Sequence, residues 1–304
     1  MSHSVTGTII AAFGRHYDIE LSGGQRLSGL PRGKKSVYAV GDRVVLESAA
    51  NPAQILRHEP RTSLLYRSDA YRQKLIAANA SQLVLVVAAE PAFSDELLSR
   101  AIVAAEHEGL ALVIVLNKTD LAERMPAARA VLEPFAALGY PIVEVCARGG
   151  AAPLLAHLSG EISVLVGQSG MGKSTLINAL VPGAAASTRE ISTALASGKH
   201  TTTHARLYDL AGGGAIIDSP GLQEFGLAHL TRQEIEFGFV EFRPLLGQCR
   251  FRDCHHDGEP DCAILQAIAA GTVHPRRRQH FRQFADEAEK IRRSAAGIPD
   301  AAPR

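Results

Sequence analysis

Gly167-Gln168-Ser169-Gly170-Met171-Gly172-Lys173-Ser174 is the stretch that decides the fold class of this 304-residue chain. It matches the phosphate-loop pattern G-x-x-x-x-G-K-[ST] and lies between a predicted strand, Ile162–Val166, and a predicted helix, Lys173–Leu180. Glycines let backbone N–H groups surround phosphate oxygens, and the helix N-terminus favours negative charge. We therefore expect Lys173 to reach the β- and γ-phosphates of a nucleotide, Ser174 to ligate Mg²⁺, and Thr175 to adjoin the nucleotide.

Around this loop, apolar strands alternate with segments of helical length. The expected strands are Leu83–Ala89, Leu110–Leu116, Ile142–Val145, Ile162–Val166, Ala205–Leu210 and Ala215–Ile217. The expected helices are one opened by Ser94-Asp95-Glu96, one over Ala127–Leu138 and one over Lys173–Leu180. This alternation predicts an α/β sheet with helices on both faces, whose ligands bind at the carboxyl ends of strands.

Asn117-Lys118-Thr119-Asp120 follows the strand Leu110–Leu116 and predicts a guanine-reading loop. The Asp120 carboxylate can accept hydrogen bonds from guanine N1–H and its exocyclic amine, a donor pair that adenine lacks. Asn117 would hold the loop, and Lys118 would lie along the plane of the base. Cys146-Ala147, after Ile142–Val145, could touch guanine O6 through the backbone, or Cys146 could simply be a small buried residue.

Two further motifs predict nucleotide-sensing loops. Asp218-Ser219-Pro220-Gly221 fits D-x-x-G, in which Asp218 faces Mg²⁺ through water and the Gly221 amide senses the γ-phosphate. One hydroxyl of Thr201-Thr202-Thr203 is expected to ligate Mg²⁺ only when the γ-phosphate is present, and the sequence does not decide among Thr201, Thr202 and Thr203.

The order of these motifs is circularly permuted, because Asp120 precedes Lys173 instead of following Asp218. Closely spaced domain termini tolerate such a permutation. As a result, the segment after Gly221 runs directly into the C-terminal part of the chain.

That C-terminal part contains a cluster of metal-ligand residues with the spacing C-x₄-C-x-H-x₅-C: Cys249, Cys254, His256 and Cys262. Three thiolates and an imidazole are typical of a closed, structural zinc site. His255 competes with His256 for the histidine position. Helices are expected over Ala263–Ala270 and His280–Arg293.

The first 60 residues predict a small β-barrel. The candidate strands are Val5–Phe13, His16–Leu21, Gly24–Ser28, Ser36–Val40 and Arg43–Leu46. An oligonucleotide-binding (OB) fold fits this trace, and an SH3-like barrel would leave a similar one. The expected domains are a barrel at 1–62, a permuted GTPase domain at 63–228 and a mainly helical zinc-binding domain at 229–304.

Composition limits the possible partners and compartments. Hydrophobic residues make up 46%, enough for a core, and no apolar run approaches the roughly 20 residues that span a bilayer. The N-terminus lacks a signal-peptide pattern, so we expect a cytoplasmic protein. Residues 1–75 hold 11 Lys/Arg against 6 Asp/Glu, and residues 276–304 hold 8 against 4. These basic ends, and the loop Arg32-Gly33-Lys34-Lys35, could contact a polyanion or could simply solvate the surface.

Taken together, the motifs resemble the RsgA (YjeQ) family of bacterial small ribosomal subunit biogenesis GTPases. The resemblance covers nearly the whole chain and includes Gly198-Lys199-His200-Thr201-Thr202-Thr203 and Glu224-Phe225-Gly226. It implies an N-terminal OB-fold and GTP hydrolysis stimulated by the 30S subunit. It also implies a role late in subunit maturation, contacts with 16S rRNA through both flanking domains, and a monomer with one structural Zn²⁺.

The resemblance also bears on catalysis. Leu222 stands where Ras-like GTPases keep a glutamine that orients the hydrolytic water, and Gln223 is one residue late. In related proteins a histidine before the threonine run takes that part, which here is His200. The alternative is that His200 is an ordinary loop residue.

Two other functions compete with this one. An ATP-using P-loop enzyme is disfavoured by Asp120. A zinc-dependent nucleic-acid-binding protein with a vestigial nucleotide site is disfavoured by the intact Lys173, Ser174 and Asp218.

Overall fold

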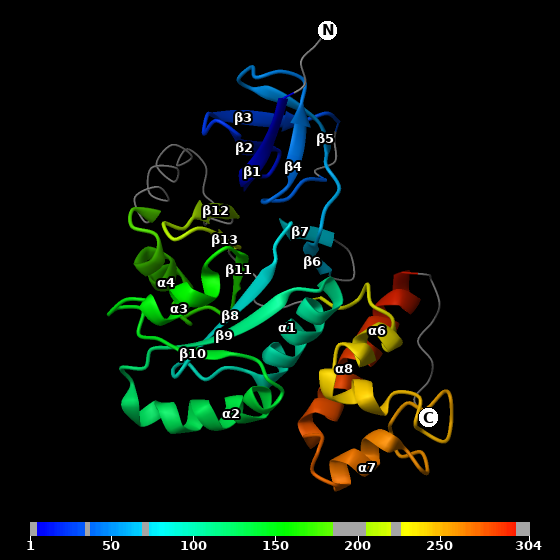
Figure 1. Ribbon diagram of the computed structural model, residues 1–304. Coiled ribbons are helices and arrows are strands. Elements are labelled where there is room, and N and C mark those ends of the chain that lie inside the picture. Colours follow the sequence, from blue (N-terminus) through cyan, green and yellow to red (C-terminus); the bar gives the residue numbers. More distant parts are fainter. Residues whose placement is uncertain (1–4, 34–36, 69–72, 185–204, 220–225, 296–304) are drawn as a thin grey trace.

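The computed structural model describes residues 5–33, 37–68, 73–184, 205–219 and 226–295. Along the chain, Figure 1 shows a small barrel, then a sheet covered by helices, then a helical region. His200, Thr201–Thr203, Gly221, Leu222 and Gln223 lie outside the described residues.

The N-terminal part is a five-stranded OB-fold barrel. Its strands are β1 (Val5–Phe13), β2 (His16–Leu21), β3 (Arg26–Pro31), β4 (Arg43–Leu46) and β5 (Ala53–His58). They pair in the order β1-β2-β3-β5-β4, and β1 also pairs with β4, which closes the barrel. Gly29 makes room for the buried Ile19, because a Cβ there would lie 2.3 Å from Ile19 Cδ1 and would force that side chain to shift.

The predicted strand Ser36–Val40 is wrong over its described residues, 37–40, and the fifth strand, β5, was not predicted. Val40 makes an isolated parallel bridge with Ala77, and side chains bind other backbone groups of this segment. Ala39 N donates to Asp42 Oδ2 (2.8 Å), and Arg61 Nη2 donates to Val37 O (2.8 Å). Asp42, which is fully buried, also accepts from Arg61 Nε at 2.6 Å.

The central part is the predicted α/β sheet. The parallel strands β8 (Gln82–Ala88), β9 (Ala111–Asn117), β10 (Ile142–Glu144), β11 (Ile162–Val166) and β13 (Ala215–Asp218) pair in the order β10-β9-β8-β11-β13. The chain thus builds one half of the sheet outward from β8 and the other outward from β11. Strand order reverses between these two neighbours, the place where open sheets bind ligands. The antiparallel β12 (Arg206–Asp209) follows β13.

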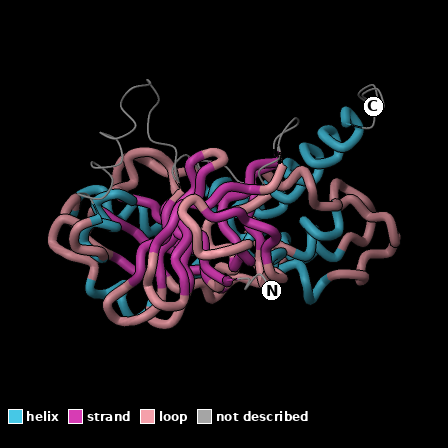
Figure 2. Tube along the Cα trace, turned by 90° about the horizontal axis from the view of Figure 1, so that it is seen from above, coloured by secondary structure: helices cyan, strands magenta, loops and turns pink. Residues whose placement is uncertain are grey.

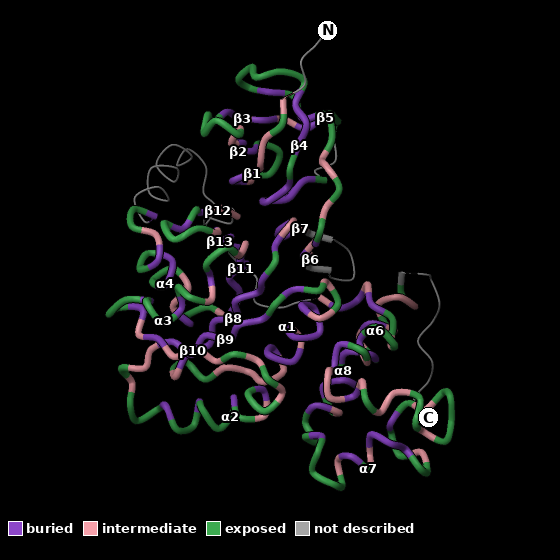
Figure 3. Tube along the Cα trace, in the orientation of Figure 1, coloured by how far each residue is buried: buried purple, intermediate pink, exposed green. Residues whose placement is uncertain are grey.

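Helices cover both faces of this sheet, as predicted. The helical elements here are α1 (Asp95–Glu108), the 3₁₀ helix η1 (Ala122–Arg124), α2 (Met125–Ala137), α3 (Ala152–Leu158) and α4 (Lys173–Leu180). Buried residues of α1 and α2 belong to one apolar cluster, and those of α3 and α4 belong to the other. Figure 2 shows helices on either side of the strands, and Figure 3 shows the strands buried between them.

The barrel is joined to this sheet by backbone hydrogen bonds. Strand β1 pairs with β12 at Ala11 and Arg206, and Ala12 N donates to Ala205 O (3.2 Å). A hairpin that was not predicted, β6 (Leu64–Ser68) and β7 (Gln73–Ala78), lies in the connection between the two parts (Figure 1).

The C-terminal part is mainly helical. It contains α6 (Arg232–Phe237), the 3₁₀ helix η2 (Val240–Leu245), α7 (Ala263–Ala269) and α8 (Pro275–Ala295). Helix α8 begins earlier than the predicted His280, because proline suits a first helical turn. It packs on α1 and α6 around a core of aromatic rings, in which Phe239 stacks on Phe242 and meets Phe281 edge-on and Phe284 at a tilt. None of the helices in the described part of the chain could cross a membrane.

Candidate nucleotide site and metal centre

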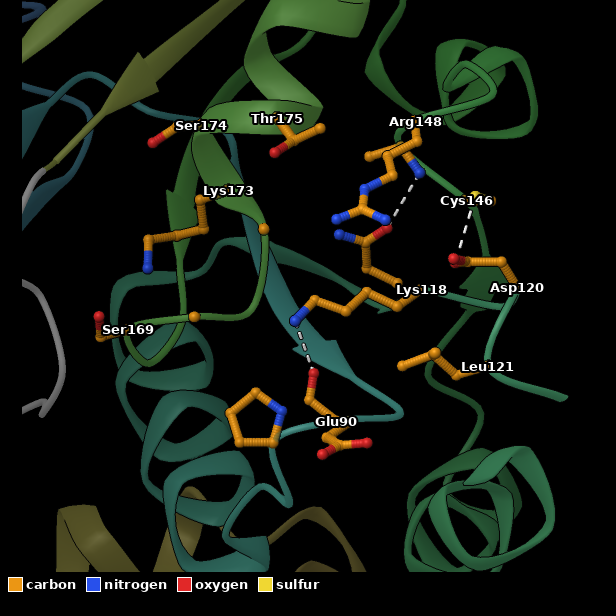
Figure 4. A pocket seen from close by; sticks show the side chains of 15 residues that line it. Glu90, Lys118, Asp120, Leu121, Cys146, Arg148, Ser169, Lys173, Ser174 and Thr175 are labelled. Atoms are coloured by element: carbon orange, nitrogen blue, oxygen red, sulfur yellow. Dashed lines mark hydrogen bonds between the residues drawn. The ribbon is translucent and has the colours of Figure 1, made fainter. Parts of the chain in front are cut away.

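A cleft of about 750 Å³ opens at the carboxyl ends of the central strands, where strand order reverses. Figure 4 shows the phosphate loop on one side and the Asn117–Asp120 loop on the other. The lining residues that the sequence predicted are Asn117, Lys118, Asp120, Cys146, Ala147, Ser169, Gly170, Gly172, Lys173, Ser174 and Thr175. The fold therefore brings together two motifs that are far apart in the sequence.

Backbone geometry explains two glycines of the phosphate loop. Gly167 has φ +152°, and a Cβ there would lie 2.2 Å from Val86 O in the neighbouring strand β8. Gly172 has φ +89°, and its Cβ would lie 2.3 Å from Asn117 Nδ2. The loop can therefore turn into α4 and touch the base loop only with glycine at both positions.

Lys173 folds back over the phosphate loop. Its Nζ donates to Gly167 O (2.5 Å) and Gln168 O (2.9 Å). Burial lowers its pKa, and the nearby Asp218 carboxylate partly opposes this shift. Burial raises the pKa of Asp218, opposed by the Lys173 charge. A half-buried ammonium and a carboxylate thus interact electrostatically beside the loop, a setting in which a phosphate or a metal ion interacts strongly.

Asn117 connects three loops of the cleft. Its side chain is buried, with Nδ2 donating to Met171 O (2.9 Å) and Oδ1 accepting from Ala147 N (3.1 Å). One amide therefore fixes the spacing between the phosphate loop, the Asn117–Asp120 loop and the loop at Cys146.

Asp120 is exposed in the cleft and accepts a hydrogen bond from the Cys146 thiol at 3.3 Å. Lys118 adopts a left-handed backbone (φ +62°), and its Nζ donates to Glu90 O at 2.7 Å. Figure 4 shows its extended side chain running across the cleft. The exposed carboxylate of Asp120 forms a polar edge of the cleft, and the aliphatic stem of Lys118 forms a flat floor.

Four lining residues were missed by the sequence reasoning: Glu90, Pro91, Leu121 and Arg148. Glu90 and Pro91 follow the carboxyl end of β8, and residues at that position beside a strand-order reversal are expected to line a ligand site. Their position after β8 was therefore the signal that could have predicted them. Thr119, Gly167, Gln168 and Met171 support the loops without lining the cleft, and Met171 is buried.

The predicted metal ligands Cys249, Cys254, His256 and Cys262 lie together, with their ligand atoms all within 4.8 Å of one another. His256 Nδ1 is 3.6, 3.5 and 3.2 Å from the sulfurs of Cys249, Cys254 and Cys262. Cys249 Sγ and Cys262 Sγ are 3.9 Å apart. Tetrahedral Zn²⁺ with ordinary bond lengths would separate N and S by about 3.6 Å and two sulfurs by about 3.8 Å. The donor set and its spacing therefore fit zinc.

His256, and not its neighbour His255, supplies the imidazole. His256 is buried in the cluster, whereas His255 is exposed and its backbone N donates to Glu259 Oε1 (2.8 Å). Burial raises the pKa of Glu259, but hydrogen bonds from four backbone N–H groups, those of Glu259 itself, His255, Asp257 and Gly258, lower it to about 2. The loop is thus fixed by a carboxylate at its tip.

Comparisons with known proteins agree with this geometry. The sequence profile of the RsgA GTPase matches residues 58–228. The "Small ribosomal subunit biogenesis GTPase RsgA" of Burkholderia pseudomallei (strain K96243) is 53% identical over 291 residues, 94% of this chain and 93% of that protein. The protein of the same name from Paraburkholderia phytofirmans is 53% identical over 301 residues, 95% of each.

Two solved structures share the fold. YjeQ from Thermotoga maritima has a TM-score of 0.73 and 29% identity, covering 94% of this chain and 99% of that one. YloQ, described as a circularly permuted GTPase, has a TM-score of 0.70 and 26% identity, covering 98% of each. The resemblance found in the sequence is confirmed: the chain belongs to the RsgA family and is a GTPase.

Proposed function

We propose that this GTPase binds the small (30S) ribosomal subunit and assists its late maturation, hydrolysing GTP to GDP and phosphate with stimulation by the subunit. The observation that carries the proposal is the cleft in which Asn117 ties the phosphate loop to the Asp120 loop. The relatives named for small-subunit biogenesis match this chain over more than nine-tenths of its length.

Guanine is read by the residues on the Asp120 side of the cleft. The Asp120 carboxylate accepts from N1–H and the exocyclic amine. Cys146 already donates to the same carboxylate, so the thiol keeps it oriented toward the cleft. Lys118, stretched toward Glu90, lies along the plane of the base, and the backbone of Thr119, Cys146 and Ala147 borders it.

Phosphates bind on the opposite side, from Gly167 to Thr175. Lys173 donates to two loop carbonyls and can transfer those hydrogen bonds to the β- and γ-phosphates, whose negative charge would raise its pKa. On nucleotide binding, the Lys173 ammonium would move away from the Gly167 and Gln168 carbonyls.

Ser174 and Asp218 are the described residues that would hold Mg²⁺ with GTP, together with one hydroxyl of Thr201, Thr202 or Thr203. The ion would neutralise charge that develops on the phosphates. The Gly221 amide senses the γ-phosphate. His200 orients the hydrolytic water, because Leu222 is apolar.

Cys249, Cys254, His256 and Cys262 hold one structural Zn²⁺ per chain, which their spacing supports. The domains are 1–62, 63–228 and 229–304. Basic surfaces of the first and the last domain contact 16S rRNA. The protein acts as a monomer in the cytoplasm, where ribosomes are assembled.

The test is GTP turnover with and without added 30S subunits. We expect strong stimulation of the natural chain and loss of GTP binding in Asp120→Ala. His200→Ala should keep GTP binding but lose the stimulated turnover. Absence of stimulation by 30S would refute the ribosomal role and leave the GTPase intact. ATP displacing GTP at equal concentration would refute the assignment of Asp120 as the guanine reader.

A further inference from the structure

We propose that Glu236 is the positioning residue of the metal centre: it holds His256 in the one tautomer and orientation that binds zinc, and so ties helix α6 to the metal. The inference rests on the zinc site proposed above.

The imidazole of His256 uses its two nitrogens on different partners. Nδ1 faces the three sulfurs, while Nε2 lies 2.6 Å from Glu236 Oε1. Both side chains are shielded, at 5% exposure for His256 and 19% for Glu236. The ring is therefore held between the thiolates and one carboxylate.

This arrangement selects a tautomer. Metal binding needs the lone pair of Nδ1, so the proton of the neutral ring must sit on Nε2. An ionised carboxylate can only accept a hydrogen bond, so Glu236 stabilises the Nε2–H form and disfavours the form that would block the metal. Such carboxylate partners are a recurrent feature of zinc-bound histidines.

The backbone of His256 also requires support. Its φ of +58° lies in the left-handed region, which is uncommon for residues other than glycine. Arg278 Nε donates to His256 O at 2.5 Å, and the Phe281 ring lies 5.8 Å from the imidazole. These contacts come from α8, so Glu236 is the contact that α6 makes with the ring.

Helix α6 is the first helix after the Asp218–Gly221 motif. Its start is fixed by a capping box in which Thr231 and Glu234 satisfy each other's backbone N–H groups. Glu234 therefore serves the helix itself, while Glu236 reaches out to His256. The position of α6 and the occupancy of the metal centre are thus linked directly through this carboxylate.

The experiment measures the Zn²⁺ dissociation constant of the full chain by competition with a chromogenic chelator. We expect Glu236→Ala to weaken zinc binding by about 10- to 100-fold. Glu236→Gln, whose amide oxygen can still accept from Nε2–H, should fall between this variant and the natural chain.

Glu234→Ala is the matched control, because it removes a carboxylate from the same helix and breaks its cap without touching His256. It should leave zinc affinity within about twofold of the natural chain. Equal loss in Glu234→Ala and Glu236→Ala would overturn the proposal, since helix stability alone would then explain it. If Glu236→Ala does not fold, Glu236→Gln decides, and unchanged affinity in that variant overturns it. A natural chain that binds no zinc at all would instead refute the zinc site itself.

Discussion

Arg277→Met is expected to destabilise the contact between the sheet and the C-terminal helices, because it leaves a buried carboxylate unpaired. Arg277 Nε and Nη2 donate to the two oxygens of Glu241 at 2.5 and 3.2 Å, with side-chain exposures of only 3% and 6%. Nη1 also donates to Ser99 Oγ in α1 (2.8 Å), and the guanidinium lies 4.4 Å from the Phe239 ring centroid.

The magnitude follows from this burial. Removing one partner of a buried ion pair costs about 3–5 kcal/mol, mostly because the remaining charge stays desolvated. Methionine retains much of the packing on Phe239, so the loss is mainly electrostatic. The matched control is Arg276→Met, one residue earlier on α8. Arg276 also pairs with a carboxylate, Asp95, but is 55% exposed, and exposed pairs contribute about 0–1 kcal/mol.

The assay is urea unfolding followed by far-ultraviolet circular dichroism on the full chain, with zinc present throughout. We expect Arg277→Met to lose several times more unfolding free energy than Arg276→Met. The double variant Arg277→Met/Glu241→Met should recover a large part of the loss, because it removes the stranded charge. Equal losses in the two single variants, or no recovery in the double variant, would refute the reasoning.

The other predictions concern the cleft and a histidine pair. Asn117→Ala should weaken GTP binding by about 2 kcal/mol, roughly 30-fold, because Ala147 N–H and Met171 C=O both lose their partner. Titration with a fluorescent guanine nucleotide measures the dissociation constant. A loss of affinity under about threefold would contradict the prediction. His229→Phe should reduce the acid sensitivity of folding. Burial, aided by His107, lowers the pKa of His229 from 6.5 to about 4. Between these pH values His229 is protonated in the unfolded chain but neutral in the folded chain. Stability from this group is complete above pH 6.5 and is lost as pH falls toward 4. Urea unfolding at a series of pH values should show the variant gaining on the natural chain only below pH 6.5, and a parallel pH profile would contradict it.

Local chemistry explains which elements the sequence predicted well. Helix α4 runs from Lys173 to Leu180 as expected, because the phosphate loop fixes its start and Val181 turns to an extended backbone. Strands β1, β2 and β4 also match, since alternating apolar residues and glycine turns are local signals. The permutation was visible as the order of motifs.

Long-range contacts explain the failures. The segment at Val37–Val40 has apolar residues suited to a strand, yet the Asp42 side chain binds the Ala39 N–H and Arg61, which is distant in sequence, binds the Val37 carbonyl. In the cleft, Glu90 and Arg148 carry no motif and are brought in only by the sheet topology. The sequence motifs thus predicted the residues that would bind the nucleotide. The other residues that line the cleft depend on which strands are neighbours in the sheet, and the sequence alone does not show this.

Both predicted nucleotide-sensing motifs lie just upstream of a contact with a flanking part of the molecule, and for Asp218–Gly221 this follows from the permutation. The Thr201–Thr203 stretch leads into Ala205, which accepts a hydrogen bond from Ala12 of the barrel strand β1. The Asp218–Gly221 motif leads into α6, whose Glu236 contacts the imidazole of the metal centre. In a GTPase with the ordinary motif order, the segment after D-x-x-G would instead continue toward the guanine-reading loop. Here each motif is joined by a short stretch of backbone to one of the two flanking parts that are expected to contact RNA. A conformational change at either motif can therefore be transmitted along the chain to that part.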